Sequence, residues 1–565
     1  MILSSAQDIE RYTGTGLWGH LSLDELFFLA AQQHPDRIAF IDPPDRRKFT
    51  DGDPRQLTFA QAADAVEALT RHFVALGLEA DDVVAVQLGN MVDSYLALLA
   101  IMRAHLIACP ITPLWREFEL AQALPQVAPR AIITASRIGG HAHADMMRFV
   151  ASGLMSVRHV MTTGRDVPDG VMGIDNPLAG ATLVPGVALP ERRRSSANHI
   201  ATICFEGGSG KAPRPVARSH NQWIAAGLAH ISASGLDHGE TILNPYFPVG
   251  LTALAGAFVP AILSASTLAL HHPFDLSALA QSLHATGAAY TMVPPAALSA
   301  LLGSGQLEDP GASLRRIGCV WSPGMTRSAA YGGESRRGGI EIVDIHNFGE
   351  TATYAARRGN ACQPGRIPLG AIAVAPEADA PTVLETRIQG GMQKAGGGEG
   401  VLTGTLRLRG PMVPAYRIGA GVERSASAQE AASDPENGGF VDFPARVRIC
   451  RTDPAQLELL PDGADSESIH VGQCAVSAVE LEKILAEHAG VADAAVCAHP
   501  DPIVGSRLAA AIVGKHGAVS DEDIRNFLRA RKLAGHKIPD LVLSVASIPR
   551  DSEGLVQRAE LAALL

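Results

Sequence analysis

The chain closes on Ile548-Pro549-Arg550-Asp551-Ser552-Glu553-Gly554-Leu555-Val556-Gln557-Arg558, and this segment decides how the rest of the sequence is interpreted. It combines a Pro-Arg pair, a polar turn that ends in glycine, and a basic residue, Arg558. The position directly after the glycine holds Leu555, an uncharged side chain. The segment therefore keeps the residues that shape a turn but carries no cation at its apex.

Length and composition indicate a globular protein with more than one domain. A chain of 565 residues exceeds the size of a single hydrophobic core, and 47% apolar with 19% charged residues is ordinary for globular proteins. A formal net charge of -11 argues against non-specific binding to nucleic acid, which needs a basic surface, and against docking on anionic lipid. We therefore expect neither nucleic acid nor membrane lipid as a partner.

The cysteines and the apolar segments bear on the compartment. The seven cysteines are scattered and lack CxxC spacing, which is typical of reduced thiols and predicts a cytoplasmic protein without a zinc site. The first residues lack the basic and apolar regions of a signal peptide. Residues 251–270 carry no charge but are rich in small residues, so we expect a buried helix there and no membrane span.

The order of predicted elements indicates an α/β fold with two domains. Helices at 23–33 and 60–76 alternate with strands such as 83–88, and this alternation continues to about residue 375, which predicts largely parallel sheets. Two stretches rich in small residues, 390–400 and 420–439, are expected to be mobile loops. From residue 464 the pattern becomes a compact α+β unit. We therefore expect a large domain at 1–463 and a small C-terminal domain at 464–565.

A glycine-rich segment at residues 205–220 is a candidate phosphate loop. Glycines let backbone N–H groups approach a phosphate, and hydroxyl groups and a cation complete such a cradle. A Walker A loop is excluded, because its first glycine would fall at Phe205 and no Ser or Thr follows Lys211. The candidate loop residues are Glu206, Gly207, Gly208, Ser209, Gly210, Lys211 and Arg214. Taken alone, such a segment is also compatible with an ordinary glycine-rich turn.

These segments, with several others in the same order, resemble the acyl-adenylate-forming (AMP-binding) superfamily in its acyl- and aryl-acid:CoA ligase branch. The further matching segments are 345–352, 404–411, 439–445, 463–473 and 478–482. The resemblance implies a large N-terminal domain with stacked αβαβα-type sheets and a small, mobile α+β C-terminal domain. It also implies a pocket inside the large domain, lined by Phe247, Pro248, Ser322, Gly324, Asn347, Phe348, Gly349, Glu350 and Thr351.

The chain departs from the family pattern at the positions that carry charge or hydroxyl groups. Where the family has the lysine that contacts the substrate carboxylate and the α-phosphate, this chain has Leu555. The family's magnesium glutamate corresponds to Ala352 and its ribose-binding aspartate to Ala445, while Asp442 lies three positions away from the latter. In the hinge, Ala464 replaces the arginine and Glu467 the aspartate. The catalytic motifs are therefore degenerate, and whether the protein is an enzyme stays open.

Three interpretations remain. In the first, the protein has lost ATP-dependent adenylation and binds or processes a small carboxylate or an acyl thioester. In the second, it is an active ligase that uses ATP, Mg²⁺ and CoA or an acyl carrier protein, with Lys211, Arg214 and Glu350 as substitutes. In the third, it is a non-catalytic partner of a paralogous ligase. Only the second requires a cofactor, and the sequence predicts no dedicated metal site.

Overall fold

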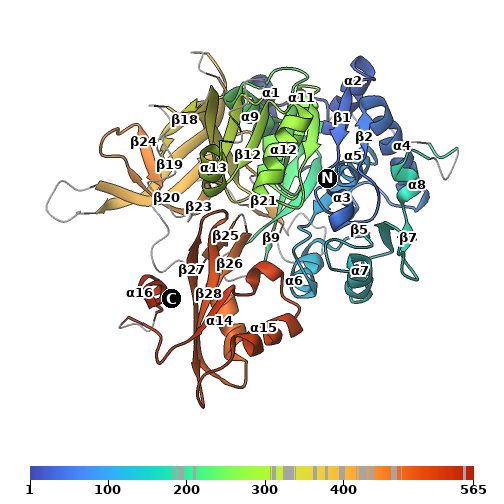
Figure 1. The fold of residues 1–565 in the computed structure, drawn as a ribbon. Helices are drawn as coiled ribbons and strands as arrows, with labels where there is room; N and C mark the ends of the chain where they lie inside the picture. The colour runs from blue at the N-terminus through green and yellow to red at the C-terminus, as the bar shows by residue number, and fades with distance from the viewer. Residues whose placement is uncertain are drawn as a thin grey trace.

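The computed structural model of the chain describes residues 1–181, 186–188, 196–207, 212–305, 307, 313–321, 336–337, 339–359, 366–375, 379–393, 401–414, 416–418, 429–431, 438–459, 468–472, 474–551 and 555–564. Three sheets form the body of the large domain, and a smaller domain follows at the C-terminus (Figure 1). The predicted boundary between residues 463 and 464 lies outside the described residues and stays a prediction.

The first sheet of the large domain has a parallel core. Within the described residues it has seven strands in the order β7-β6-β5-β3-β4-β8-β9, and β9 runs antiparallel to β8 in a hairpin. The strands are β3 (Val83–Gln87), β4 (Ile107–Pro110), β5 (Ala131–Ala135), β6 (His159–Thr163), β7 (Met172–Gly173), β8 (Ile200–Glu206) and β9 (Arg214–Ser219). Continuous apolar strands suit a parallel sheet that is covered on both faces.

The second sheet stacks on the first. Its described strands follow the order β14-β15-β13-β12-β10-β11-β1-β2, with β16 paired to β15. The strands are β1 (Ile38–Ile41), β2 (Gln56–Thr58), β10 (Thr241–Asn244), β11 (Thr267–Leu270), β12 (Tyr290–Val293), β13 (Arg316–Trp321), β14 (Arg336–Arg337), β15 (Ile340–Phe348) and β16 (Ala352–Arg357). β15 and β16 are antiparallel, and the turn between them lies beside the candidate site.

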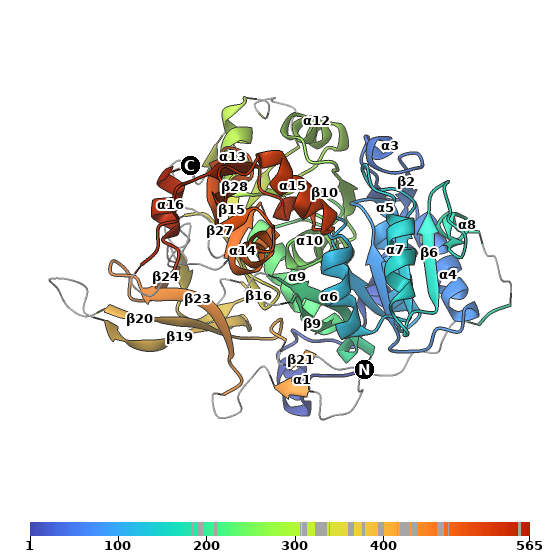
Figure 2. The same cartoon turned by 90° about the horizontal axis from the view of Figure 1, so that it is seen from below.

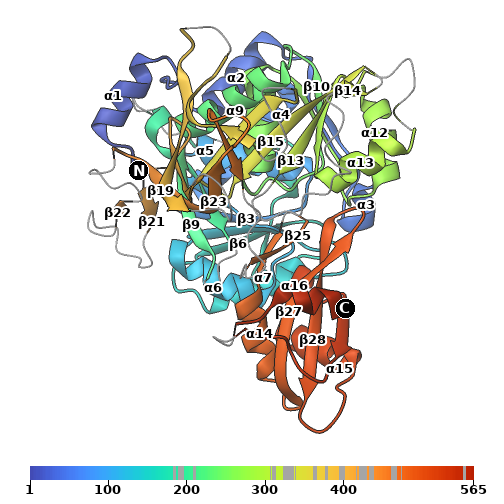
Figure 3. The same cartoon turned by 90° about the vertical axis from the view of Figure 1, so that its left-hand side faces the viewer.

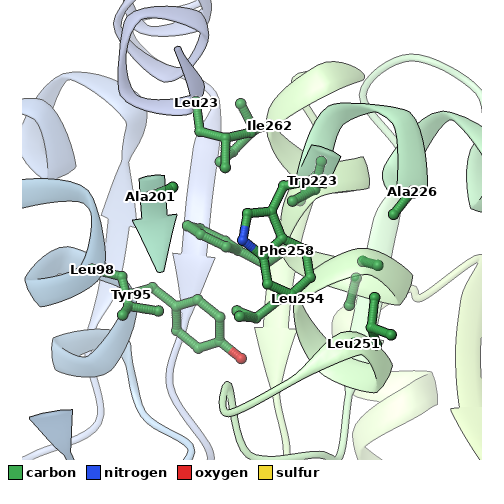
Figure 4. Close-up of a cluster of buried hydrophobic side chains, with 14 of the residues drawn as sticks. Leu23, Tyr95, Leu98, Ala201, Trp223, Ala226, Leu251, Leu254, Phe258 and Ile262 are labelled. Carbon is green, nitrogen blue, oxygen red and sulfur yellow. The ribbon is translucent and has the colours of Figure 1, made fainter. Parts of the chain in front are cut away.

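Helices fill the space between the two sheets and cover both outer faces. One core contains side chains from the inner faces of both sheets and from the middle helices, as Figure 4 shows for Trp223, Phe258 and their neighbours. The middle layer consists of α2 (Leu23–Gln33), α4 (Phe59–Ala75), α5 (Val92–Arg103), α9 (His220–Ser234), α10 (Leu251–Ala253), the π-helix η2 (Leu254–Phe258) and α11 (Val259–Leu263).

The outer helices pack on separate apolar clusters. α6 (Glu117–Val127) and α7 (His143–Ser152) cover the first sheet, and α12 (Leu276–Thr286) and α13 (Pro295–Gly303) cover the second. Shorter helices are α1 (Ala6–Gly14), α3 (Arg46–Phe49), α8 (Asp175–Leu178) and η1 (Ser196–Asn198). The layers are therefore helix, sheet, helix, sheet, helix, which confirms the predicted fold class.

A third, antiparallel sheet stands beside these layers (Figure 2). Its described strands are β17 (Arg366–Pro368), β18 (Gly370–Ala373), β19 (Thr382–Gln393), β20 (Val401–Arg409), β23 (Val441–Ile449) and β24 (Gln456–Leu459). A small pair, β21 (Tyr416–Ile418) and β22 (Gln429–Ala431), lies nearby.

Three expectations for this part of the chain need correction. The alternation of strands and helices ends well before residue 375, since no helix follows α13 in the described part of the large domain. Residues 390–393 belong to β19 and not to a loop, and β22 interrupts the second predicted loop. Residues 251–270 hold a helix only as far as residue 263, because a turn then leads into strand β11.

The small domain lies below the large one in Figure 3 and has its own sheet. Its elements are β25 (Ser468–Val471), β26 (Cys474–Ser477), α14 (Ala478–Ala486), β27 (Val491–Asp501), β28 (Gly505–Gly514), α15 (Asp521–Ala530), η6 (Gly535–Lys537), β29 (Leu541–Ser544) and α16 (Arg558–Leu564). α14 and α15 cover one face of the sheet β27-β28-β29, and α16 with the tail covers the other.

Helix α6 joins the two domains. The carboxylate of Glu119 is buried, accepts hydrogen bonds from the Ala534 N–H at 3.2 Å, and lies 3.3 Å from the Lys537 ammonium. Lys537 also pairs with Glu480 of α14 at 2.7 Å, and the Phe118 ring packs against the apolar cluster under α14. We call Glu119, Ala534, Lys537 and Glu480 the α6 joint.

Among the described residues, no helix has the length and apolar character needed to cross a bilayer.

Candidate functional site

The candidate site lies where the β8–β9 hairpin, the β15–β16 turn and the start of α10 come together. Glu206 ends β8 and is paired with Arg214, the first residue of β9, through a 2.8 Å ion pair. At the other end of α6, the Gln126 amide donates a 2.8 Å hydrogen bond to the Pro213 carbonyl. The hairpin that carries the candidate phosphate loop is therefore attached to the same helix that holds the small domain.

The β15–β16 turn brings its backbone close to Glu206. Gly349 has a φ of +51°, and a Cβ at this position would lie 2.3 Å from Glu206 Oε1. A glycine suits both the left-handed backbone and the close approach. Phe348, just before it, is buried with its ring edge-on to Phe443, and the Thr351 N–H donates to the Phe348 carbonyl at 2.8 Å. The turn thus places Glu350 beside Glu206.

Glu350 lies against the start of α10. Its Oε1 accepts a 3.3 Å hydrogen bond from the Leu251 N–H, and a Cβ on Gly250 would come within 2.1 Å of the same oxygen. Because Gly250 has no side chain, the Glu350 carboxylate can occupy the space beside it. Nearby, the Asn347 amide donates to the Thr252 hydroxyl at 2.7 Å. The predicted pocket residues on this turn accordingly lie together at one end of α10.

Arg218 on β9 is the buried cation of the site. It is 0% exposed, and its Nη2 donates to the carbonyls of Glu350 at 2.7 Å and Thr351 at 3.4 Å. Its guanidinium lies over the Trp223 ring at 4.6 Å. Nη1 lies 3.6 Å from Glu350 Oε2, and neither atom has a hydrogen-bond partner among the described residues. The pair is therefore electrostatic without a hydrogen bond between these atoms.

Burial controls the protonation of this pair. Burial raises the pKa of the Glu350 carboxyl to about 7, Arg218 and the Leu251 N–H oppose the rise, and the neighbouring Glu206 adds to it. Burial also lowers the pKa of Arg218 from its ordinary value. A carboxyl that titrates near neutral pH beside a buried guanidinium is a common feature of functional sites. Glu350 therefore changes its charge near neutral pH.

Two described residues at positions that the resemblance assigns to charged groups of the family are Ala352 and Ala445. Ala352 is fully buried and pairs with Phe348 at the start of β16. Ala445 is buried in β23, whereas Asp442 is exposed and pairs with Arg407 at 2.5 Å. Asp442 therefore takes part in a surface ion pair.

Leu555 lies in the tail of the small domain. Its side chain is 54% exposed, and its N–H donates to the Asp551 carboxylate at 2.9 Å. The neighbouring Ile548 and Val556 pack with α16 on one face of the small-domain sheet, whereas the contact with α6 is on the other face. Ile548, Val556 and α16 therefore lie on the face of the sheet opposite the α6 joint.

The remaining predicted residues divide into two groups. Phe247 lies against His272 with ring centroids 5.1 Å apart, and Pro248 is buried beside it. Burial lowers the pKa of His272 to about 4, so this imidazole is neutral at physiological pH and is a poor proton donor. The other group lies outside the described residues: Gly208, Ser209, Gly210, Lys211, Ser322, Gly324 and Glu467.

Arg218 was absent from the predicted site residues. A signal for it exists in the sequence, because this arginine follows the apolar pair Val216-Ala217 and comes directly before Ser219, the buried N-cap of α9. A charged residue inside a buried strand requires partners, since an isolated buried charge is costly. Its partner Glu350 is 132 residues away along the chain, so that pairing emerges only from the fold.

The described residues do not fit the Mg²⁺ and ATP that the family resemblance implies. At the position that the resemblance assigns to the magnesium glutamate lies buried Ala352, whose side chain offers no oxygen ligand. Within the described part of the chain, no three His, Cys, Asp or Glu side chains are grouped so that they could hold a metal ion. Two carboxylates, Glu206 and Glu350, lie at the β15–β16 turn, close enough to repel each other. We therefore derive no chemical step through this cofactor.

Comparisons with known proteins agree with this architecture. The AMP-binding enzyme family matches residues 27–365, and the AMP-binding enzyme C-terminal domain matches residues 480–555. The medium-chain fatty-acid–CoA ligase of Escherichia coli strain K12 is 22% identical, over 97% of this chain and 91% of its own. The salicyl-AMP ligase / salicyl-S-ArCP synthetase of Mycobacterium tuberculosis is 23% identical, over 97% of this chain and 91% of its own.

A solved structure extends the likeness to the fold. A double mutant of the o-succinylbenzoate CoA synthetase of Bacillus subtilis is similar with a TM-score of 0.70 at 17% identity, covering 96% of this chain and 99% of that protein. The likeness thus includes both the stacked sheets and the small domain. The chain belongs to the AMP-binding enzyme family, in its branch of acyl- and aryl-acid ligases.

Proposed function

We propose that the protein binds a small carboxylic acid or an acyl thioester and does not form acyl-adenylates from ATP. The observation that supports this most directly is the pairing at the phosphate end of the site. Arg214 is paired with Glu206 at 2.8 Å, and Arg218 faces Glu350 at 3.6 Å. Each of these two arginines therefore already faces a carboxylate of the chain itself.

Electrostatics supports the loss of adenylation. Adenylation requires stabilisation of the charge on a pentacovalent phosphate, and such stabilisation dominates catalysis of this kind. A carboxylate about 4 Å from a phosphate costs roughly 4 kcal/mol at an effective dielectric constant near 20. Ala352 and Leu555 supply no compensating charge. Because the loss of one well-placed group costs about 10² to 10³ in rate, we expect negligible acyl-AMP formation.

The named relatives suggest the ligand class. They include a ligase named for medium-chain fatty acids and one named for salicylate and a carrier-bound thioester. An aromatic side chain, Phe247, is available at one side of the site, beside the neutral His272. We infer that a carboxylate or its thioester with CoA or an acyl carrier protein is the ligand, and salicylate and octanoate are the first probes.

A second candidate is an active ligase that uses substitute residues. One observation favours it: Arg214, at the position of the family's loop lysine, is 41% exposed and is free to exchange Glu206 for a phosphate. In that case Lys211 and Glu350 would complete the set, and ATP, Mg²⁺ and CoA would be required. If neither an acid nor a thioester binds, the protein is instead a non-catalytic partner of a paralogous ligase.

Acid-dependent exchange of pyrophosphate into ATP separates these functions. We expect exchange at the rate of a protein-free control with salicylate, benzoate and octanoate, together with measurable binding of at least one acid or its CoA thioester by calorimetry. Exchange that requires both the protein and an acid would establish the active ligase. A parallel assay with synthetic acyl-AMP and CoA asks whether the thioester-forming half-reaction persists.

For the compartment we propose the cytoplasm. The described cysteines are all free, and the sequence lacks the spacing of a disulfide framework. Reduced thiols are the rule in a cytosolic environment and the exception in secreted proteins. Fractionation of the source cells would test this, and recovery in a secreted fraction would contradict it.

A further inference from the structure

Building on the proposed function, we propose that Arg218 and Glu350 form an oxyanion-binding site that the protein fills with its own carboxylate. In the absence of ligand, Glu350 faces Arg218. An oxyanion group of the ligand takes this place when Glu350 becomes protonated or moves aside. The oxyanion is either the carboxylate of an acid or the phosphate of a nucleotide, since a guanidinium binds both.

The guanidinium of Arg218 is held rigidly with one donor group free. Its Nη2 is engaged by the carbonyls of Glu350 and Thr351, and its Nε by the carbonyl of Met412 at 3.4 Å. The ring of Trp223 fixes the guanidinium plane from one side. Only Nη1 lacks a hydrogen bond within the described residues. A buried donor without a partner is costly, so its retention points to a group that binds there.

Glu350 covers this free donor. Its side chain is 14% exposed whereas Arg218 is 0% exposed, so an incoming group meets Glu350 first. Its Oε1 is held by a single 3.3 Å hydrogen bond from the Leu251 N–H, and its Oε2 has no hydrogen bond within the described residues. The side chain is therefore weakly held compared with the arginine behind it. This asymmetry makes Glu350 the removable member of the pair.

The charged neighbours of Glu350 act on it in opposite directions. Arg218 on β9 attracts the carboxylate, while Glu206 on β8 repels it, and Glu206 is itself paired with Arg214. The Cys204 thiol on β8 also lies in this environment, and burial keeps it neutral because its pKa is raised. Burial and Glu206 raise the pKa of Glu350 to about 7, so protonation near neutral pH removes the competing charge and leaves Arg218 to bind an anion.

The test compares wild type with Glu350→Gln. Glutamine keeps the length of the side chain and an oxygen for the Leu251 N–H but removes the charge. Salicylate and AMP are titrated into each protein at pH 6 and pH 8 by calorimetry, and the ratio of the wild-type to the variant Kd is taken for each probe. The ratio cancels any titration of the probe itself. With a pKa of about 7 for Glu350, we expect this ratio to rise about tenfold from pH 6 to pH 8.

Matched controls keep the test specific. Glu385→Gln makes the same change in a carboxylate that is paired with Arg409 on the third sheet, where the arginines lower the pKa of the acid. Its ratio should stay near one at both pH values. Gly250→Ala provides an independent variant if Glu350→Gln does not fold, because a Cβ there would lie 2.1 Å from Glu350 Oε1 and displace the carboxylate. It should also tighten anion binding at pH 8.

Each outcome of the titrations supports or overturns the oxyanion-binding site. A ratio that rises for salicylate alone assigns the site to the acid, and one that rises for AMP alone assigns it to a phosphate. A ratio that is flat with pH for both probes overturns the oxyanion site, although binding of salicylate would leave the proposed function intact. Absence of binding to both proteins overturns the site as well. The proposed function then depends on the separate titration with acyl-CoA and on pyrophosphate exchange.

Discussion

Glu119 and Glu350 are both carboxylates placed beside cations, but their surroundings differ. Glu119 in the α6 joint accepts hydrogen bonds from the Ala534 N–H and lies within 3.3 Å of Lys537. Glu350 has one hydrogen bond, and its second oxygen faces Arg218 at 3.6 Å without a hydrogen bond to any described residue. Both oxygens of the Glu119 carboxylate therefore accept hydrogen bonds, whereas only one oxygen of Glu350 does so within the described residues.

The difference separates a structural contact from a binding site. Buried polar groups in native proteins are almost always hydrogen-bonded, so the α6 joint has the form of a contact that stabilises the fold. The Arg218–Glu350 pair keeps unused hydrogen-bonding capacity, and such capacity is a cost to stability unless a ligand uses it. We infer that the α6 joint serves the fold and that the Arg218–Glu350 pair serves binding.

The largest effect is expected from Glu119→Ala. The substitution leaves the Ala534 N–H without an acceptor and removes one of the two carboxylates around Lys537. Removal of one partner from a buried ion pair is strongly destabilising, and we expect about 3 kcal/mol in the docking of the small domain. Amide hydrogen exchange at residues 532–538, measured with the free energy of unfolding, reports this loss.

Glu117→Ala is the control for this prediction. Glu117 pairs with Lys532, whose side chain is 61% exposed. An exposed ion pair contributes about 0–1 kcal/mol, so the small domain should stay docked. Equal effects of the two substitutions would contradict the view that the joint depends on Glu119.

A pH-dependent effect of comparable size is expected from Glu350→Gln. The pKa of Glu350 is raised from 4.5 to about 7 in the folded protein, so the folded state binds the extra proton more tightly than the unfolded state. The stability that this group contributes is present below pH 4.5 and is lost as the pH rises through 7. The variant lacks this titration. Its free energy of unfolding, relative to that of the wild type, should therefore rise by up to roughly 3 kcal/mol between pH 4.5 and pH 8.

Urea unfolding at pH 5 and pH 8 measures this difference. Glu385→Gln should change in the opposite direction, because its arginine partners lower the pKa of that carboxyl in the folded state. If the stability difference between wild type and Glu350→Gln were the same at both pH values, Glu350 would not be a proton-binding group near pH 7.

A smaller loss is expected from Gly349→Ala. The backbone at this position has a φ of +51°, and the new Cβ would meet Glu206 Oε1 at 2.3 Å. The left-handed conformation costs about 1–2 kcal/mol for a residue with a side chain, and displacement of Glu206 would weaken its pair with Arg214. Urea unfolding should show a loss of this size, whereas Gly207→Ala, which meets nothing within 4 Å, should not. Equal losses would contradict the close contact.

The smallest effect is expected from Leu555→Lys. Leu555 is exposed, so stability should change by no more than about 0.5 kcal/mol. The lysine restores one charge of the family, but Ala352 and the paired carboxylates remain, so acid-dependent pyrophosphate exchange should stay at background. Exchange that appears with this single substitution would mean that the rest of the site can still support adenylation. It would contradict the view that the carboxylates beside Arg214 and Arg218 prevent this reaction.

The fold could be predicted where local signals are strong. Helix α2 was predicted at 23–33 and has those bounds, and α4 was predicted one residue late. Both helices begin with a capping box, Ser22 with Glu25 and Thr58 with Gln61, and both have a regular apolar face. The order of the motifs along the chain then identified the family.

The remaining features depend on distant partners. Two adjacent glycines made residues 390–393 look like a loop, yet Gly390 pairs with Gly404 on the neighbouring strand. The backbones approach closely there, since a Cβ on Gly390 would lie 2.0 Å from the Thr403 carbonyl oxygen. Strand β11 was missed because residues 251–270 are uncharged throughout and show no clear change of period. The Arg218–Glu350 pair joins residues of different sheets, and no local pattern predicts such a contact.

Calorimetric titration of the wild-type protein with MgATP tests the central claim most directly. We predict no heat of binding at micromolar to submillimolar nucleotide, because the described arginines Arg214 and Arg218 face carboxylates of the chain itself and the Ala352 side chain offers no ligand to a metal ion. A micromolar Kd for MgATP would contradict the account and would establish that the altered site still binds the nucleotide of its family.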